Sequence, residues 1–412
     1  MVQSHKASTQ LQANNMREQD VRFLKSVFAE YYSKHSEAVY VPPPVSSREI
    51  GFAVWPDRAM VRHMSFRSLN DVREHIVNGT PADAYHSCAV YESPEKPMEY
   101  KTALWADLAF DVDAKDVQPS CVEEMTYSVC PKCGTHRKGK KKCPNCSEES
   151  HTVEFMSSEC IASTAHQTKR LCLALVEEIG IEAKDIAVYF SGHMGFHVYV
   201  TSKAIGELSP DARREITSYL SLEGAMDGYL PGKPANIRTI RAGGIGKRLQ
   251  EEILDIVDNA NQHADILEDD GIVLLESNKQ RILPALNKGK IEDIVALLGT
   301  KRARKLFRRA WKRAAIVVDP SVTMDVHRVF RMPGTLNSKS GLPKQSVPLD
   351  RIEGDVLSMI PEYGRAEVQV TVSFAPKTEI GKDKVGPFSN ETVTISRYMA
   401  AYLILKGVAS VG

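Results

Sequence analysis

Apolar and polar positions follow two periods along this chain, and their order predicts an α+β protein. Helical spacing marks residues 21–31, 68–79, 165–179 and 396–407. Short apolar runs bounded by Gly, Pro, Asn or Asp predict strands. These runs lie at 48–55, 59–66, 86–93, 102–113, 186–190, 196–200 and 367–374. The middle of the chain, residues 202–315, is rich in helix formers and predicts a helical insertion.

Two Cys-x-x-Cys pairs, with nine residues between them, interrupt the first half of this pattern. Four thiolates on two tight turns are typical of a structural Zn²⁺ site. Disulfides fit poorly with a long chain that shows no secretory signal. The predicted zinc ligands are Cys130, Cys133, Cys143 and Cys146. We take the other cysteines as ordinary buried or free thiols: Cys88, Cys121, Cys160 and Cys172.

The pattern divides the chain into four predicted parts. They are a polar N-terminal arm (1–20), a first core part (21–201) with a zinc module at 121–150, the helical insertion (202–315), and a second core part (316–412). No apolar run approaches the roughly 20 residues of a membrane span, and the N-terminus lacks the apolar core of a signal peptide. We therefore expect a cytoplasmic protein, or a nuclear one if the source is a eukaryote, with no membrane partner.

The net charge of the 412 residues is only +1, so charge is informative only in two short basic runs. Residues 137–142 (RKGKKK) hold five basic residues in six, and residues 301–313 (KRARKLFRRAWKR) hold eight in 13. Either run could contact phosphate. A solvated helix or loop face is the more common role of such a run, and we favour it for each taken alone. In 301–313, apolar residues at helical spacing predict one packed face and one basic face.

The strand that ends in FDVD carries two aspartates one residue apart. Side chains alternate along a strand, so Asp111 and Asp113 point to one face with Cα atoms about 6.5–7 Å apart. Aspartates at a strand end commonly cap the next helix. When the Asp-x-Asp pattern is considered without the other motifs, capping is the favoured interpretation. The pair could instead hold Mg²⁺ or Mn²⁺ together with substrate phosphates. This second role requires a third anionic ligand and a surface that binds triphosphate.

Two further segments could supply these groups. In YFSGHMGFHVYV (189–200), Ser191, Gly192 and His197 could converge on an anion, although a plain hairpin is the simpler interpretation of this segment alone. In 316–341, Asp319 follows an apolar run that we take as a strand, much as Asp111 does. The side chains of this segment that could contact phosphates are Arg331, Ser338 and Lys339.

Taken in order, these segments resemble the small, catalytic subunit of the archaeal and eukaryotic DNA primase. That family carries an Asp-x-Asp pair in an apolar strand (here FDVD) and a Ser-Gly-x-x-Gly-x-His turn (here SGHMGFH). A third aspartate precedes an Arg/Lys-x-Pro run and a Lys-Ser/Thr-Gly loop (here VDPSVTMDVHRVFRMPGTLNSKSG). A zinc module lies between the first two motifs, and REIGF and VRHMSF resemble the early arginine-containing strands. The order of the motifs makes the similarity specific, and it covers most of residues 31–348.

The resemblance implies a catalytic core of mixed β-sheets flanked by helices, into which the zinc module and the helical insertion are set. It implies that Asp111, Asp113 and Asp319 hold two Mg²⁺ or Mn²⁺ ions for nucleotidyl transfer. The residues that it assigns to nucleotide binding are Arg48, Arg62, Ser191, Gly192, His193, His197, Arg331 and Lys339. The implied activity is synthesis of short RNA, or also DNA, primers on a single-stranded DNA template during replication. The implied partners are a larger primase subunit, the template and primer, and nucleoside triphosphates.

Two alternatives stay open at this point. One is a primase-like polymerase of repair or end joining, although such relatives generally lack the zinc module and the large helical insertion. The other is a non-catalytic zinc-containing scaffold of a replication complex, against which the intact aspartate triad argues. The chain also departs from the family pattern at Met194 (Arg in the family) and Asn337 (His in the family). If Met194 lies beside the triphosphate, Met194→Arg should lower KM; if the turn is shifted, Met194 packs inside and His193 supplies the contact.

Overall fold

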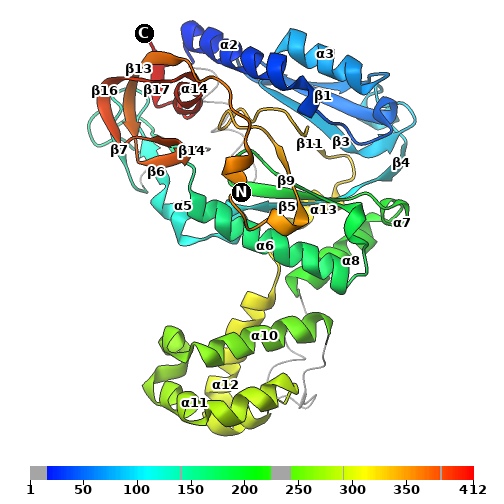
Figure 1. The fold of residues 1–412 in the computed structure, drawn as a ribbon, viewed down its shortest axis with the longest axis vertical. Coiled ribbons are helices and arrows are strands. Elements are labelled where there is room, and N and C mark those ends of the chain that lie inside the picture. Colours follow the sequence, from blue (N-terminus) through cyan, green and yellow to red (C-terminus); the bar gives the residue numbers. More distant parts are fainter. Residues whose placement is uncertain (1–15, 140–141, 224–242, 291, 381–382) are drawn as a thin grey trace. The chain divides into compact units, whose positions relative to one another are not determined.

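The computed structural model describes residues 16–139, 142–223, 243–290, 292–380 and 383–412, which form two compact units (Figure 1). Unit 1 comprises Met1–Lys169, Lys184–Pro210 and Ser321–Gly412, and unit 2 comprises Arg170–Ala183 and Asp211–Pro320. Unit 2 therefore starts and ends later than the predicted insertion and adds the end of a helix that precedes it. Of the predicted N-terminal arm, residues 1–15 lie outside the described residues.

Two antiparallel sheets form the centre of unit 1. The first has the order β11-β3-β1-β2, with β4 paired to β3, and the second has the order β12-β9-β10-β5. The strands of the first sheet are β1 (Arg48–Val54), β2 (Ala59–Met64), β3 (Asp83–Tyr91), β4 (Ala103–Ala106) and β11 (Val329–Arg331). Those of the second are β5 (Leu108–Asp113), β9 (Ile186–Phe190), β10 (Gly195–Val200) and β12 (Gln345–Val347).

A buried cluster joins the two sheets. Cys88 and Phe330 come from the first sheet, Ala109 and Tyr199 from the second, and Val322 from the short helix α13 (Pro320–Met324). On the outer side of the first sheet, α2 (Glu18–His35) and α3 (Leu69–Gly79) lie along β1 (Figure 1). A capping box of Ser68 and Asp71 begins α3.

A third sheet closes the C-terminal part of unit 1. It contains β13 (Glu367–Ala375), β16 (Phe388–Ser396) and β17 (Ala409–Val411), with α14 (Arg397–Leu405) packed against it. The cysteine-rich segment forms a small sheet of β6 (Thr126–Val129), β7 (His136–Arg137) and β8 (His151–Glu154). Its His136 ring stacks on Phe374 of β13 with 3.6 Å between centroids, so the third sheet supports the cysteine-rich segment.

Unit 2 is helical and has its own apolar core. Its main helices are α8 (Pro210–Ser221), α10 (Gly244–Asp258), α11 (Ala264–Asn287) and α12 (Glu292–Ala314). The basic run 301–313 lies on α12, where Arg302, Arg309 and Arg313 form ion pairs with acidic residues of α10 and α11. These pairs explain the run as a solvated, charge-paired helix face. Among the described residues, no helix has the length and apolar character needed to cross a bilayer.

The α+β class is confirmed, and three details differ from the expectations. Every strand pair of the described residues is antiparallel, whereas the resemblance implied mixed sheets. The run before Asp319 forms no strand in the described part of the chain. Cys121 of α5 (Ser120–Glu124) forms a disulfide with Cys160 of α6 (Ser158–Glu177). The prediction that both are ordinary thiols is therefore wrong, because the packing of two helices brings together cysteines that are 39 positions apart in sequence.

Candidate active site

The register of β5 and β10 builds the acidic side of the site. Asp111 pairs with His197, and Asp113 pairs with Gly195, so these side chains share one face of the second sheet. The Nε2 atom of His197 lies 3.7 Å from an Asp111 carboxylate oxygen. Both aspartates stay half-buried rather than fully covered. The face therefore presents two carboxylates and one imidazole, as the alternation along FDVD predicts.

The electrostatics of this face of the second sheet favour binding of a cation. Burial and the neighbouring Asp113 carboxylate raise the pKa of Asp111 to about 7. Burial, with Lys344 and Arg331 nearby, lowers the pKa of His197 well below its usual range, so the imidazole is neutral at pH 7. A carboxylate pair whose ionisation is suppressed in this way suits a divalent cation, since Mg²⁺ and Mn²⁺ prefer oxygen ligands.

Asp113 also caps the helix that follows β5, which is the structural alternative to metal binding. One of its carboxylate oxygens accepts a hydrogen bond at 3.5 Å from the Lys115 backbone at the start of α4 (Ala114–Val117). The Lys115 ammonium lies 3.9 Å from its other oxygen. The long capping bond occupies only part of the carboxylate's acceptor capacity. Capping and metal binding are therefore compatible at Asp113.

The Ser191–Gly195 turn between β9 and β10 is held by backbone contacts. The Ser191 amide donates to the Gly195 carbonyl at 2.9 Å, and the His193 amide donates to the Ser191 hydroxyl at 3.3 Å. Gly192 has a positive φ of 81°, and a Cβ there would lie 2.6 Å from the Leu342 carbonyl. Glycine is required because the turn passes this close to the backbone of a second loop.

That second loop, residues 337–342, is clasped to the turn. The Asn337 side-chain amide donates to the Ser191 carbonyl at 3.0 Å and accepts from the Lys339 amide at 2.9 Å. The Ser340 hydroxyl donates to the Gly192 carbonyl. Asn337, one of the two departures from the family pattern, is thus the residue that joins the two predicted phosphate-binding loops.

A buried acidic residue that sequence reasoning missed orders this region further. Asp83, at the start of β3, forms an ion pair with Arg331 and accepts hydrogen bonds from the Ser338 amide at 2.8 Å and its hydroxyl at 2.6 Å. Arg331 also donates to the Leu336 carbonyl at 3.1 Å. Asp83 therefore holds Arg331 and the 337–342 loop together, whereas the Lys339 side chain is exposed.

Lys344 is the second residue that sequence reasoning missed. It is fully buried and donates to the Tyr199 hydroxyl at 2.7 Å and the Arg331 carbonyl at 2.8 Å. Its ammonium lies over the rings of Tyr189 and Tyr199. A lone lysine before a short strand carries no local signal of burial, so only the packing of the two sheets reveals it.

The two N-terminal arginines differ from each other. Arg48 is 1% exposed, forms an ion pair with Asp107 at 2.6 Å, and donates to four backbone carbonyls. Each of its three guanidinium nitrogens is therefore bonded within the protein, and its role in nucleotide binding stays a prediction. Arg62 is 31% exposed and pairs with buried Glu49 at 2.7 Å. It keeps a partly accessible guanidinium and stays a predicted nucleotide contact.

Met194, the other departure, is buried, and its carbonyl accepts from the Ala114 amide at 3.1 Å. An arginine here would have to bury its guanidinium, which is costly without a partner. The structure favours the shifted turn, in which His193 and not residue 194 faces other polar groups. Asp319, the third predicted metal ligand, is the penultimate residue of unit 2 and stays a predicted member of the triad.

Four cysteines of unit 1 could hold a metal ion such as Zn²⁺. Their sulfur atoms all lie within 4.8 Å of one another. Three of the sulfur–sulfur distances are 3.4, 3.5 and 3.8 Å, near the roughly 3.8 Å separation expected of tetrahedral ligands at about 2.3 Å from Zn²⁺. The cluster consists of the predicted ligands Cys130, Cys133, Cys143 and Cys146.

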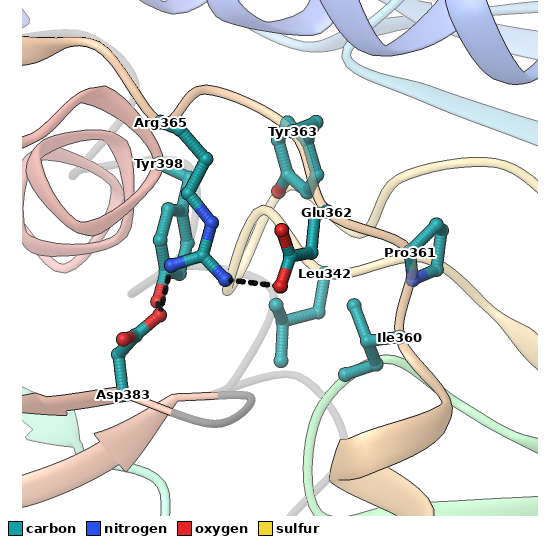
Figure 2. Close-up of a pocket in the computed structure, with 8 residues that line it drawn as sticks. All are labelled: Leu342, Ile360, Pro361, Glu362, Tyr363, Arg365, Asp383 and Tyr398. Atoms are coloured by element: carbon teal, nitrogen blue, oxygen red, sulfur yellow. Dashed lines mark hydrogen bonds and ion pairs between the residues drawn. The ribbon is translucent and has the colours of Figure 1, made fainter.

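Two cavities of unit 1 are lined by none of the predicted site residues. Figure 2 shows the smaller, of about 20 Å³, where Arg365 bridges Glu362 and Asp383 and the Tyr398 hydroxyl also bonds Asp383. It has room for about one water molecule. The larger, of about 540 Å³, lies between α6 and residues 353–357. We do not assign a substrate to either.

Comparison with known proteins defines the class to which this site belongs. A model of the family described as DNA primase small subunit matches residues 156–351. The DNA primase small subunit of Cenarchaeum symbiosum is 31% identical over 96% of this chain and 100% of its own length. That of Nitrosopumilus maritimus is 30% identical over 96% and 100%. The chain belongs to the DNA primase small subunit family.

Among solved structures, the polymerase domain of Mycobacterium tuberculosis Ligase D in complex with DNA matches 80% of this chain and 83% of that chain. Its TM-score of 0.34 and sequence identity of 11% are too low to support an argument about this protein.

The raised pKa of Asp111 predicts how stability depends on pH. A carboxyl whose folded pKa lies above its unfolded value stabilises the fold at low pH, and this stabilisation is lost as pH rises to about 7. In chelator, Asp111→Asn should remove a decline of a few kcal/mol between about pH 4 and pH 7. Urea unfolding at each pH measures the slope. Mn²⁺ should raise the Tm of wild type at pH 7.5 but not that of Asp111→Asn. Identical slopes for the two proteins would contradict the raised pKa.

Arg48→Met should destabilise unit 1 by about 3–5 kcal/mol, because it leaves the buried Asp107 carboxylate without this counter-charge. Urea unfolding checks the loss, and Arg48→Met combined with Asp107→Asn should recover part of it. Arg62→Met is the matched control, with a smaller loss because Lys101 still pairs with Glu49. Equal losses of stability for the two arginine variants would contradict this structural role of Arg48.

Cys133→Ser should lower the metal content of the protein and the thermal stability of the cysteine-rich segment, since it removes one of four ligands. Elemental analysis and release of zinc to a chromogenic chelator measure the content. Cys172→Ser, which alters a buried thiol outside the cluster, should keep stoichiometric metal. Wild-type protein without stoichiometric zinc would exclude the site.

Proposed function

We propose that this chain is the catalytic subunit of a DNA primase and synthesises primers on single-stranded DNA by nucleotidyl transfer. One observation carries the proposal. The carboxylate face of β5, with Asp111 opposite His197, lies directly next to the turn that is clasped to the 337–342 loop. An acidic pair and a triphosphate-binding surface are the two parts that the reaction needs, and here one strand pair, β5 and β10, joins them.

The proposed role of Asp319 as the third metal ligand is supported by its short separation along the chain from Val322. Val322 packs in the buried cluster with Ala109, which shares its face of β5 with Asp111. Asp319 precedes Val322 by three residues, so its Cα lies at most about 11 Å from that of Val322. On this short separation along the chain, we propose Asp111, Asp113 and Asp319 as the metal ligands.

Each group then has a defined task. Two Mg²⁺ or Mn²⁺ ions, when bound, would acidify the primer 3′-hydroxyl and neutralise charge on the departing pyrophosphate. The three aspartates would hold these ions, and His197 would remain a neutral donor beside Asp111. The turn amides, Arg331 and Lys339 would position the triphosphate for in-line attack. Arg62 would contact the nucleotide from β2.

The remaining assignments follow from the family. The two relatives named above are small subunits, and we propose that this chain forms a heterodimer with a large subunit. We propose Zn²⁺ as the metal of the four cysteines, with a structural role. Because both relatives are archaeal, we place the protein in the cytoplasm. Repair polymerase and non-catalytic scaffold are the outcomes that the following experiment separates from primer synthesis.

Primer synthesis on single-stranded DNA by the purified chain, with and without a large subunit, tests the function. Asp319→Asn should lose incorporation by orders of magnitude, as should Asp111→Asn, because each removes a metal ligand without changing side-chain volume. Asp325→Asn is the matched control, since Asp325 is exposed and caps its own turn through the His327 amide. Equal activity of the Asp319 and Asp325 variants would contradict the triad. A wild-type chain that incorporates no nucleotide would favour the non-catalytic scaffold.

A further inference from the structure

Lys406, at the end of α14, makes an unusual contact with the predicted triphosphate-binding turn. Its Nζ lies 2.8 Å from Nε2 of His193, and both residues are buried, at 7% and 9% exposure. The two residues are 213 positions apart in sequence. A lysine and a histidine are both bases, so a buried hydrogen bond between them requires a specific protonation state.

The chemistry of the pair determines that state. An ammonium has no acceptor, so when Lys406 is protonated it donates and Nε2 of His193 accepts. The hydrogen of the neutral imidazole therefore sits on Nδ1. Burial, with Lys406, Lys339 and Arg331 nearby, lowers the pKa of His193 well below its usual range, which keeps this ring neutral. His193 is thus left with an Nδ1–H donor, the form that an anion requires.

The surroundings of Lys406 are rich in positive charge. Its pKa falls to about 7 because of burial and, in spite of Glu154, because of Lys339 and Arg58. Arg58, in the hairpin between β1 and β2, has buried Nε and Nη2 atoms, and no described residue accepts a hydrogen bond from either. Buried cations, and buried guanidinium nitrogens without a hydrogen-bond acceptor, are costly unless an anion neutralises them, and near Arg58 the described acidic group is Asp83. The positive charge around Lys406 would therefore suit a polyanionic ligand.

We propose that Lys406 is a positioning residue for the nucleotide triphosphate. It holds His193 as an Nδ1–H donor and, with Arg58, supplies the positive charge that the family places on an arginine at position 194. The inference rests on the proposed function, because the ligand class is the nucleotide of that reaction. It also explains why the turn retains a binding surface although Met194 is buried. A bound triphosphate would in turn keep the Lys406 ammonium protonated.

The test compares Lys406→Met, Lys406→Arg and wild type in the full chain, with Lys377→Met as a control at an exposed lysine. Lys406→Met should raise the KM for nucleotide about tenfold with little change in kcat, and weaken binding of inorganic tripolyphosphate, measured by calorimetry, by a similar factor. Lys406→Arg should retain most of both, since it keeps the donor and the charge. Lys377→Met should match wild type.

A spectroscopic measurement separates positioning from a merely structural role. In ¹⁵N-histidine spectra, His193 should be an Nδ1–H tautomer in wild type and lose this preference in Lys406→Met. Its signals are assigned by their absence in His193→Asn. Should Lys406→Met fail to fold, Arg58→Met, at a half-buried hairpin position, should still weaken tripolyphosphate binding.

Two outcomes are distinguishable. Unchanged KM, tripolyphosphate affinity and tautomer in a folded Lys406→Met would overturn this inference and leave the proposed function standing. The opposite outcome has two parts: the wild-type chain makes no primers, and Lys406→Met binds tripolyphosphate more weakly than wild type does. This outcome would overturn the proposed function and support the anion site.

Discussion

The antiparallel register of β5 and β10 is the constraint on which the site depends. It sets His197 opposite Asp111 and Gly195 opposite Asp113, and it begins the Ser191–Gly195 turn beside the carboxylates. A Cβ at position 195 would lie 2.8 Å from the Val112 carbonyl, so the close approach of the strands requires glycine there. A shift of one residue would turn the aspartates to the opposite face of the sheet. The register of β5 and β10 therefore determines whether the two aspartates and His197 lie on one face of the sheet.

Charge is distributed unevenly around this register. The acidic pair lies on β5, while unit 1 buries several basic groups wholly or in part: Arg331, Lys344, Lys406 and Arg58. Of the four, Arg331 forms an ion pair with Asp83, whereas the other three form no ion pair among the described residues, although acidic groups lie near each of them. Such an arrangement reduces the stability of the free protein, because desolvated charges of one sign repel each other. A nucleotide with its metal ions carries the complementary charges, so substrate binding and neutralisation of the site would be one event.

The two departures from the family pattern have different physical consequences. Asn337 joins the Ser191–Gly195 turn and the 337–342 loop through the Ser191 carbonyl and the Lys339 amide, which is a structural use of a position where the family has histidine. Met194 turns inward, and the polar role of the turn passes to His193. A motif can thus lose an arginine and keep a cationic surface, provided that a residue from elsewhere in the fold reaches the same place.

Local pattern alone determined much of this molecule. Periodicity located the helices and strands, the alternation of FDVD placed two carboxylates on one face, and paired Cys-x-x-Cys turns identified four sulfurs that converge. These features depend on residues within one element or one short loop, where backbone geometry leaves few choices. The motif order then identified the family.

Tertiary structure decided what each charged residue does. Arg48 and Arg62 stand in similar strands, yet only packing shows that Arg48 is enclosed by Asp107 and backbone carbonyls while Arg62 stays partly accessible. Packing also pairs Cys121 with Cys160 and brings Lys406 to His193. Burial and distance between remote residues set the pKa and the hydrogen-bond partners of such groups. No local sequence pattern contains that information, because it arises from contacts across the whole of unit 1.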